Sequence, residues 1–273
     1  MTDTLFAKLD SRALVAVTGE GWRAFLQGLI TQDVEGLAEG GMRFSALLTP
    51  QGKFLFDMFV IAGADGCLLD VQADQREALI QRLTMYRLRA KVGIEVVEGA
   101  VWAAWGSNVD GRWSADPRLS ELGWRAIDPS LPSGARVADE AAYDAHRLSL
   151  GVPDTSRDCV PDKTYPLEAD FDLLDAIDFK KGCFIGQETT SRMKRRGAIK
   201  SRMLPIDFDG PPPAPGSEIL AGDLRAGEVL SGQDGRATAL VRLDRIAGAD
   251  LTVDGRKVRV VFPSWFPQPA END

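Results

Sequence analysis

The chain has 273 residues, and its 32 basic and 40 acidic side chains give a formal net charge of −8. Its contents of 44% hydrophobic and 26% charged residues are typical of globular proteins, and its length suggests about two domains. The acidic balance disfavours a general nucleic-acid or anionic-membrane binder. No window approaches the roughly 18 apolar residues of a membrane span. Residues 1–10 are charged and lack the apolar core of a signal peptide.

The cysteines and the single histidine exclude several kinds of site. The three cysteines are Cys67, Cys159 and Cys183, and their spacing includes no C-x-x-C pair. Three cysteines are too few for a disulfide framework, so we expect the protein in a reducing compartment, the cytoplasm. With only His146 available, we expect no intrinsic metal site. His146 follows alanines in a predicted helix, where we interpret it as a surface residue.

The N-terminal part predicts an antiparallel sheet. Residues 12–18 form a predicted strand, and the G-x-G-x-x-A match at 19–24 leads into a helical segment, as in dinucleotide-binding folds. Residues 43–49 and 54–61, however, flank the turn sequence 50–53 and predict a hairpin. A hairpin is incompatible with the parallel unit that the fingerprint requires, so we reject nucleotide binding.

Further elements alternate along the chain. A helix is predicted from Asp74 onward, strands over 67–71, 93–97 and 101–105, and a second helix over 139–150. The proline-rich residues 208–216 are typical of a linker. The strand-like runs behind it predict a small antiparallel barrel or sandwich; they are 227–230, 238–243, 251–253 and 257–262.

The segment 179–197 carries the most chemistry. Residues 186–196 predict a short helix with Gln187 and Glu188 in its first turn and basic residues in its last turns, a charge order that complements the helix dipole. Cys183 would then lie just before the helix N-terminus, beside Lys180 and Lys181, where a thiolate is favoured. A nucleophilic or redox-active thiol is one interpretation, and an inert buried cysteine is the other.

A run of basic residues follows without any acid between Thr189 and Ile206. It suits an anionic ligand or partner, although a solvated helix end is an equal alternative. It has no interleaved aromatic residues for stacking bases, which disfavours nucleic acid. The run comprises Arg192, Lys194, Arg195, Arg196, Lys200 and Arg202.

Asp57 is the third candidate, because it is the one charge in the apolar strand 54–61. A strand buried on both faces does not hold an unpaired carboxylate. Asp57 therefore either pairs with an arginine, such as Arg87 or Arg89, or binds an amine or heteroaromatic ligand in an apolar pocket.

The sequence 181–188, Lys-Gly-Cys-Phe-Ile-Gly-Gln-Glu, followed by Arg192, resembles the signature of the YgfZ family. This family comprises folate-binding iron–sulfur cluster assembly proteins related to the aminomethyltransferase (T-protein) of the glycine cleavage system. The resemblance implies an α+β body of two intertwined antiparallel-sheet subdomains with helices and a C-terminal β-barrel. We expect the body at 1–207 with its second subdomain at roughly 43–105, the linker at 208–216 and the barrel at 217–268.

The same resemblance implies a function. We expect a tetrahydrofolate-binding factor that assists assembly or repair of iron–sulfur proteins, with client or assembly proteins as partners. Cys183, Lys181 and Asp57 would carry the chemistry, and Asp57, Gln187, Glu188 and Arg192 would contact folate. The glycine-cleavage enzymes lack a cysteine at the signature and keep two adjacent acids where this chain has Phe56 and Asp57. A folate-dependent aminomethyl transferase of one-carbon metabolism, using Asp57, is the alternative.

Overall fold

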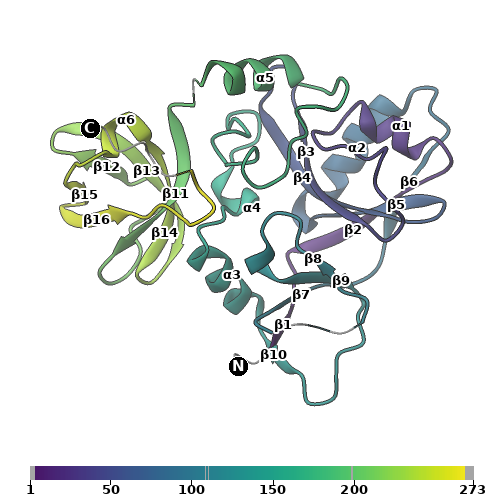
Figure 1. Ribbon diagram of the computed structural model, residues 1–273, viewed down its shortest axis with the longest axis horizontal. Coiled ribbons are helices and arrows are strands. Elements are labelled where there is room, and N and C mark those ends of the chain that lie inside the picture. Colours follow the sequence, from purple (N-terminus) through teal and green to yellow (C-terminus); the bar gives the residue numbers. More distant parts are fainter. Residues whose placement is uncertain (1–3, 108, 110, 198, 268–273) are drawn as a thin grey trace.

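The computed structural model describes residues 4–107, 109, 111–197 and 199–267. Two five-stranded sheets with their helices form the body, and a closed six-stranded barrel lies at the other end of the molecule (Figure 1). This α+β architecture is the one that the sequence predicts. None of the described helices is long and apolar enough to cross a membrane.

The first sheet is antiparallel throughout, with strand order β3-β4-β5-β2-β6. Residues 50–53 form the predicted hairpin turn, in which Gly52 has a φ of 79°. The neighbours of β2 both run antiparallel to it, which confirms that the glycine fingerprint after β2 has no nucleotide-binding context. The strands are β2 (Arg12–Thr18), β3 (Met42–Leu48), β4 (Phe54–Ala62), β5 (Gly66–Gln72) and β6 (Gly93–Val97).

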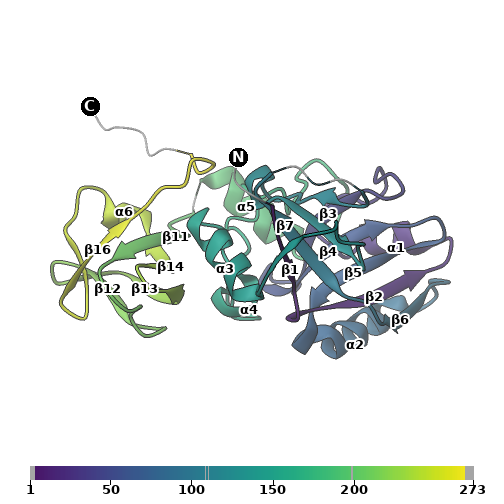
Figure 2. The same ribbon diagram turned by 90° about the horizontal axis from the view of Figure 1, so that it is seen from below.

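The two faces of this sheet have different surroundings. The helices α1 (Trp22–Gln27) and α2 (Arg76–Arg87, after the 3-10 turn η1, Ala73–Gln75) cover one face, and Figure 2 shows α2 along β2 and β6. Met58 of β4 packs into the core under these helices. Because strand side chains alternate between faces, Asp57 and Phe59 point to the opposite face.

The second sheet has the strand order β10-β1-β7-β9-β8 and packs against α3 (Glu140–Ser149). Asp139 caps α3 by accepting a hydrogen bond from the amide of Ala142 at 2.9 Å. His146 is not the surface residue that we expected, because its ring stacks on Trp105 and is half-buried. The strands are β1 (Leu5–Lys8), β7 (Val101–Trp105), β8 (Ser114–Ala115), β9 (Trp124–Ile127) and β10 (Arg136–Ala138), with the 3-10 turn η2 (Ser120–Leu122) before β9.

The barrel closes in the order β11-β14-β13-β12-β15-β16, and α6 (Leu243–Ile246) lies against it. Its first strand, β11, ends at Phe208, so the predicted linker is mainly the connection between β11 and β12 inside the barrel, and the body ends before β11. Pro205, which has no N–H to donate to a ladder, lies within the pairing of β11 with β14, opposite Thr238. The strands are β11 (Ser201–Phe208), β12 (Glu218–Ala221), β13 (Leu224–Gln233), β14 (Arg236–Arg242), β15 (Leu251–Val253) and β16 (Arg256–Val260).

The predicted second subdomain, 43–105, also differs from the observed sheets. β2 lies outside this range but fills the first sheet between β5 and β6, whereas β7 lies inside it but belongs to the second sheet. The chain thus starts in the second sheet with β1, forms the first sheet with β2 to β6, and returns to the second sheet at β7, an interleaving that local sequence does not reveal. Between the sheets and the barrel lie α4 (Thr155–Asp158) and α5 (Gln187–Arg196) (Figure 1).

Candidate functional site

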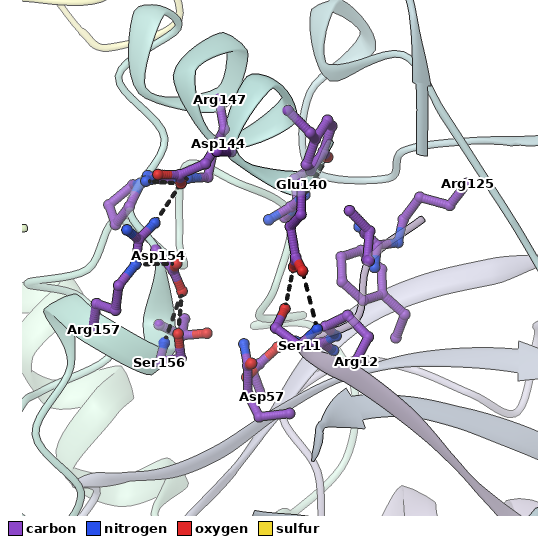
Figure 3. A pocket seen from close by; sticks show the side chains of 18 of the residues that line it. Ser11, Arg12, Asp57, Arg125, Glu140, Asp144, Arg147, Asp154, Ser156 and Arg157 are labelled. Atoms are coloured by element: carbon purple, nitrogen blue, oxygen red, sulfur yellow. Dashed lines mark hydrogen bonds and ion pairs between the residues drawn. The ribbon is translucent and has the colours of Figure 1, made fainter. Parts of the chain in front are cut away.

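A cavity of about 390 Å³ lies on the face of the first sheet that is opposite α1 and α2. β2 and β4 provide its floor, α3 and the start of α4 provide one wall, and Gln233 of the barrel also lines it. Figure 3 shows Asp57 and Arg12 on the strands, facing Glu140, Asp144 and Arg147 of α3. Three parts of the fold therefore meet at this cavity.

Asp57 is the predicted site residue that lines the cavity. Its side chain is buried, with 3% of the residue exposed, and its Oδ2 accepts a hydrogen bond from Nη1 of Arg12 at 2.9 Å. Its Oδ1 is also buried and has no hydrogen-bond partner among the described residues. A buried carboxylate oxygen without a donor is costly in a protein interior, so this atom is a candidate ligand acceptor.

The arginine that pairs with Asp57 is Arg12, so the expectation of Arg87 or Arg89 is wrong. Arg87 ends α2, which covers the other face of the sheet. Strand β5 lies between β4, which carries Asp57, and β2, which begins with Arg12. The long side chain of Arg12 crosses β5 to reach Asp57. The strand order decides this contact.

A buried ionic network supports the cavity floor. Nε of Arg12 lies 2.6 Å from Oδ1 of Asp70, and Nη2 of Arg125 lies 2.6 Å from Oδ2 of the same carboxylate. Burial alone would raise the pKa of Asp70, but these two arginines outweigh it and hold the pKa below its ordinary value. The guanidinium carbon of Arg125 lies 4.0 Å from the ring centre of Phe59. The floor is therefore fixed before any ligand arrives.

A second ionic cluster forms the outer wall. Nη2 of Arg147 lies 2.6 Å from Asp144, Arg157 also pairs with Asp144, and Nε of Arg157 lies 2.7 Å from Asp154. Although burial acts to raise the pKa of Asp154, the two arginines lower it to about 2. Gln233 donates to Oδ2 of Asp144 at 3.0 Å, which ties the barrel to this wall.

The signature segment lies elsewhere, at the start of α5. Gly186, with a φ of 82°, begins the helix, and a Cβ there would lie 2.7 Å from the carbonyl oxygen of Thr49. A Cβ on Gly52 would likewise lie 2.9 Å from Cβ of Thr189. These glycines let the β3–β4 hairpin pack directly against α5.

Lys181 fastens the same segment to the chain after α1. Its Nζ donates to the carbonyl oxygens of Ile30 at 2.8 Å and Gln32 at 2.7 Å. Partial burial lowers the pKa of its ammonium group to about 8, against the opposing charges of Asp33 and Asp178. Its hydrogen bonds therefore hold the backbone around Cys183 in place.

Cys183 is exposed to solvent, whereas Cys67 and Cys159 are buried. Glu188 and Arg192 are exposed on α5. The side chain of Gln187 reaches only the carbonyl oxygen of Gly182, at 3.4 Å. The structure describes the whole signature, and none of its residues lines the cavity. The predicted residues thus form two separate places, Asp57 in the cavity and the signature on the surface.

Within the described part of the chain, some residues of the basic run form ion pairs and others form none. Arg202 is buried and pairs with Asp170 and Asp172, and Lys194 pairs with Asp172 at 2.6 Å. Arg192, Arg195 and Arg196 line a shallow hollow of about 300 Å³ on α5. They lie outside the cavity, so any ligand tail in it would meet other arginines.

Sequence analysis did not identify Arg12, Arg125 or the α3 residues of the cavity. One feature of the sequence could have indicated this polar site. Asp70 is a charged residue in the apolar strand β5, as Asp57 is in β4. Two carboxylates facing one side of neighbouring strands indicate a polar centre there.

The fold and the central cavity define a T-protein-like α+β protein with a C-terminal barrel. The crystal structure of the glycine cleavage system aminomethyltransferase T from Bartonella henselae superposes with a TM-score of 0.80 over 97% of this chain and 86% of that one, at 20% identity. Residues 200–268 match the family described as the CAF17 C-terminal beta-barrel domain.

Sequence relatives place the chain more narrowly. The human mitochondrial iron–sulfur cluster assembly factor IBA57 is 31% identical, over 95% of this chain and 85% of the relative. The mouse protein of the same name is also 31% identical, over 97% and 86%. The chain therefore belongs to the IBA57/CAF17/YgfZ family of iron–sulfur cluster assembly factors.

Proposed function

We propose that the protein assists assembly or repair of iron–sulfur proteins, binds a tetrahydrofolate-type ligand in the central cavity, and uses Cys183 as a functional thiol. Family membership supports the iron–sulfur role. The observation that carries the ligand proposal is the unpartnered Oδ1 of Asp57, buried at the cavity floor.

The cavity suits such a ligand in chemistry and in size. The pterin ring of a folate presents N–H donors along one edge, and Asp57 Oδ1 is an acceptor that needs a donor. The volume of about 390 Å³ lies within the range of small-molecule sites. Arg12 would hold Asp57 in this orientation, and Arg147 and Arg157 would lie nearest an anionic tail.

Cys183 would act on a group that a partner brings to the surface. Its thiol is exposed in the segment just before Gly186, the residue at which α5 begins. The free cysteines suit a reducing compartment such as the cytoplasm. Lys181 would position the segment through its carbonyl contacts, while Gln187, Glu188 and Arg192 would order the first turns of α5.

Thermal unfolding with and without tetrahydrofolate tests the ligand. A ligand that binds only the native state raises the melting temperature. We expect a rise for the wild type and for Cys183→Ser, and little or none for Asp57→Asn, whose amide lacks the second carboxylate oxygen. No rise in the wild type would exclude the ligand proposal.

Complementation tests the thiol separately. In cells that lack this protein, Cys183→Ser should fail to restore iron–sulfur enzyme activity, and the variant should still bind folate. Full restoration would remove Cys183 from the mechanism. If purified protein instead shows folate-dependent transfer that Asp57→Asn abolishes and Cys183→Ser spares, the aminomethyl transferase is the correct function.

A further inference from the structure

We propose that residues 85–91, here named the basic tip, dock onto an acidic segment of a partner protein that also presents an apolar side chain. The basic tip comprises the last turn of α2 and the turn that follows it. None of its residues lines the folate cavity, and it does not include the Cys183 segment. The proposal is therefore independent of the function proposed above.

The charge of this region is opposite to that of the whole protein. No acidic residue lies between Glu77 and Glu95, although the chain carries a net charge of −8. Arg87, Arg89 and Lys91 are all exposed, and within the described part of the chain their side chains make no hydrogen bond or ion pair. These cations are available to a partner.

Apolar side chains accompany these cations. Leu88 is 88% exposed and Met85 is 68% exposed, and both are among the most exposed large hydrophobic residues described. A single exposed leucine is ordinary on a protein surface. Met85 and Leu88, by contrast, are two large apolar side chains within four positions, and Arg87 and Arg89 flank Leu88. This combination of exposed apolar and charged groups is typical of the centre of an interface.

The basic tip is a tight turn. Leu88 has a φ of 39°, which is uncommon for a bulky residue, and the amide of Ala90 donates to the carbonyl oxygen of Arg87 at 2.6 Å. At its base, a Cβ on Gly19 would lie 2.6 Å from the carbonyl oxygen of Lys91, so the two backbones are in close contact. The tight turn leaves Leu88 exposed at its apex, where the side chain can contact a partner.

These features favour an acidic protein segment over other anions. Tyr86, the aromatic residue of the tip, is half-buried against the core and is not free to stack on bases. A bilayer anchor needs more buried apolar surface than two side chains supply. An acidic segment with an apolar residue matches both the cations and Leu88, and the charges would speed its association.

Fluorescence anisotropy with a defined probe tests the proposal. The probe is a fluorescein-labelled peptide in which glutamates surround two leucines, and a second peptide replaces the leucines by serine. We expect Arg87→Glu/Arg89→Glu to weaken binding of the leucine peptide at least about tenfold. Leu88→Asn should weaken it about threefold or more without affecting the serine peptide.

The double variant Arg195→Glu/Arg196→Glu is the matched control, because it changes the net charge equally but on α5. It should bind the leucine peptide like the wild type, and melting curves should show that all three variants are folded. Equal losses in the control, no binding by the wild type, or no effect of Leu88→Asn would overturn the proposal. Co-sedimentation with phosphatidylserine vesicles that depends on Leu88, without peptide binding, would assign the tip to membranes instead.

Discussion

Asp57 and Arg12 form an ion pair at 2.9 Å on the cavity floor, although β5 separates their strands. Arg12 holds Asp70 at the same time, so one guanidinium group compensates two buried carboxylates. Oδ1 of Asp57 has no hydrogen-bond partner among the described residues, whereas Oδ2 is held by Arg12. The site is thus pre-organised around a single open acceptor.

Replacing Arg12 by leucine should destabilise the protein strongly. Asp57 would lose its partner, and Asp70 would keep only Arg125. Leaving buried charges uncompensated costs about 3–5 kcal/mol. Urea unfolding measures this loss. Lys8→Ala is the control, because its ion pair with Asp10 is exposed and its loss should change the free energy of unfolding far less. Similar losses in both variants would contradict the importance of the buried network.

Sequence patterns predicted the strands of the first sheet and the helices α2, α3 and α5, because local alternation and turn residues determine them, but they missed β1, β8, β9, β10 and β11. They also identified Asp57, because a charge in an apolar strand is a local anomaly. They could not identify Arg12 as its partner, since that contact depends on which strands become neighbours. Arg202 is a second example. The sequence placed it in a basic run, but in the structure it is buried and forms ion pairs with Asp170 and Asp172, which lie about 30 positions earlier in the chain.

Asp154 should contribute stability that is lost in acid. Its pKa is about 2 in the folded state against an ordinary 3.8, so the folded carboxylate resists protonation. The stabilisation is fully present above pH 3.8 and disappears as the pH falls toward 2, amounting to about 2 kcal/mol. Asp154→Asn keeps the α4 cap but removes the charge. Its urea stability should lie below that of the wild type at neutral pH and converge with it in acid. Parallel curves would show that Asp154 does not have this role.

Gly186 and Gly210 provide a matched pair for the contact between the β3–β4 hairpin and α5. Their φ values are 82° and 83°, but a Cβ on Gly186 meets Thr49, Gly52 and Leu48, whereas one on Gly210 meets nothing within 4 Å. Gly210→Ala should cost only the backbone strain, about 1–2 kcal/mol. Gly186→Ala should cost about 3 kcal/mol or more, because steric overlap adds to the strain. Equal changes in the free energy of unfolding would mean that the hairpin can move away from α5 without cost.

The three thiols should differ sharply in reactivity. Cys183 is exposed, while burial raises the pKa of Cys67 to about 12 and raises that of Cys159 well above its ordinary value. Because thiolates are the reactive form, iodoacetamide should label one cysteine rapidly in the native protein and all three in urea. Mass spectrometry should locate the rapid label at Cys183, and Cys183→Ser should remove it. Rapid labelling of Cys67 or Cys159 in that variant would reveal local opening of the core and would weaken the assignment of Cys183 as the one accessible thiol.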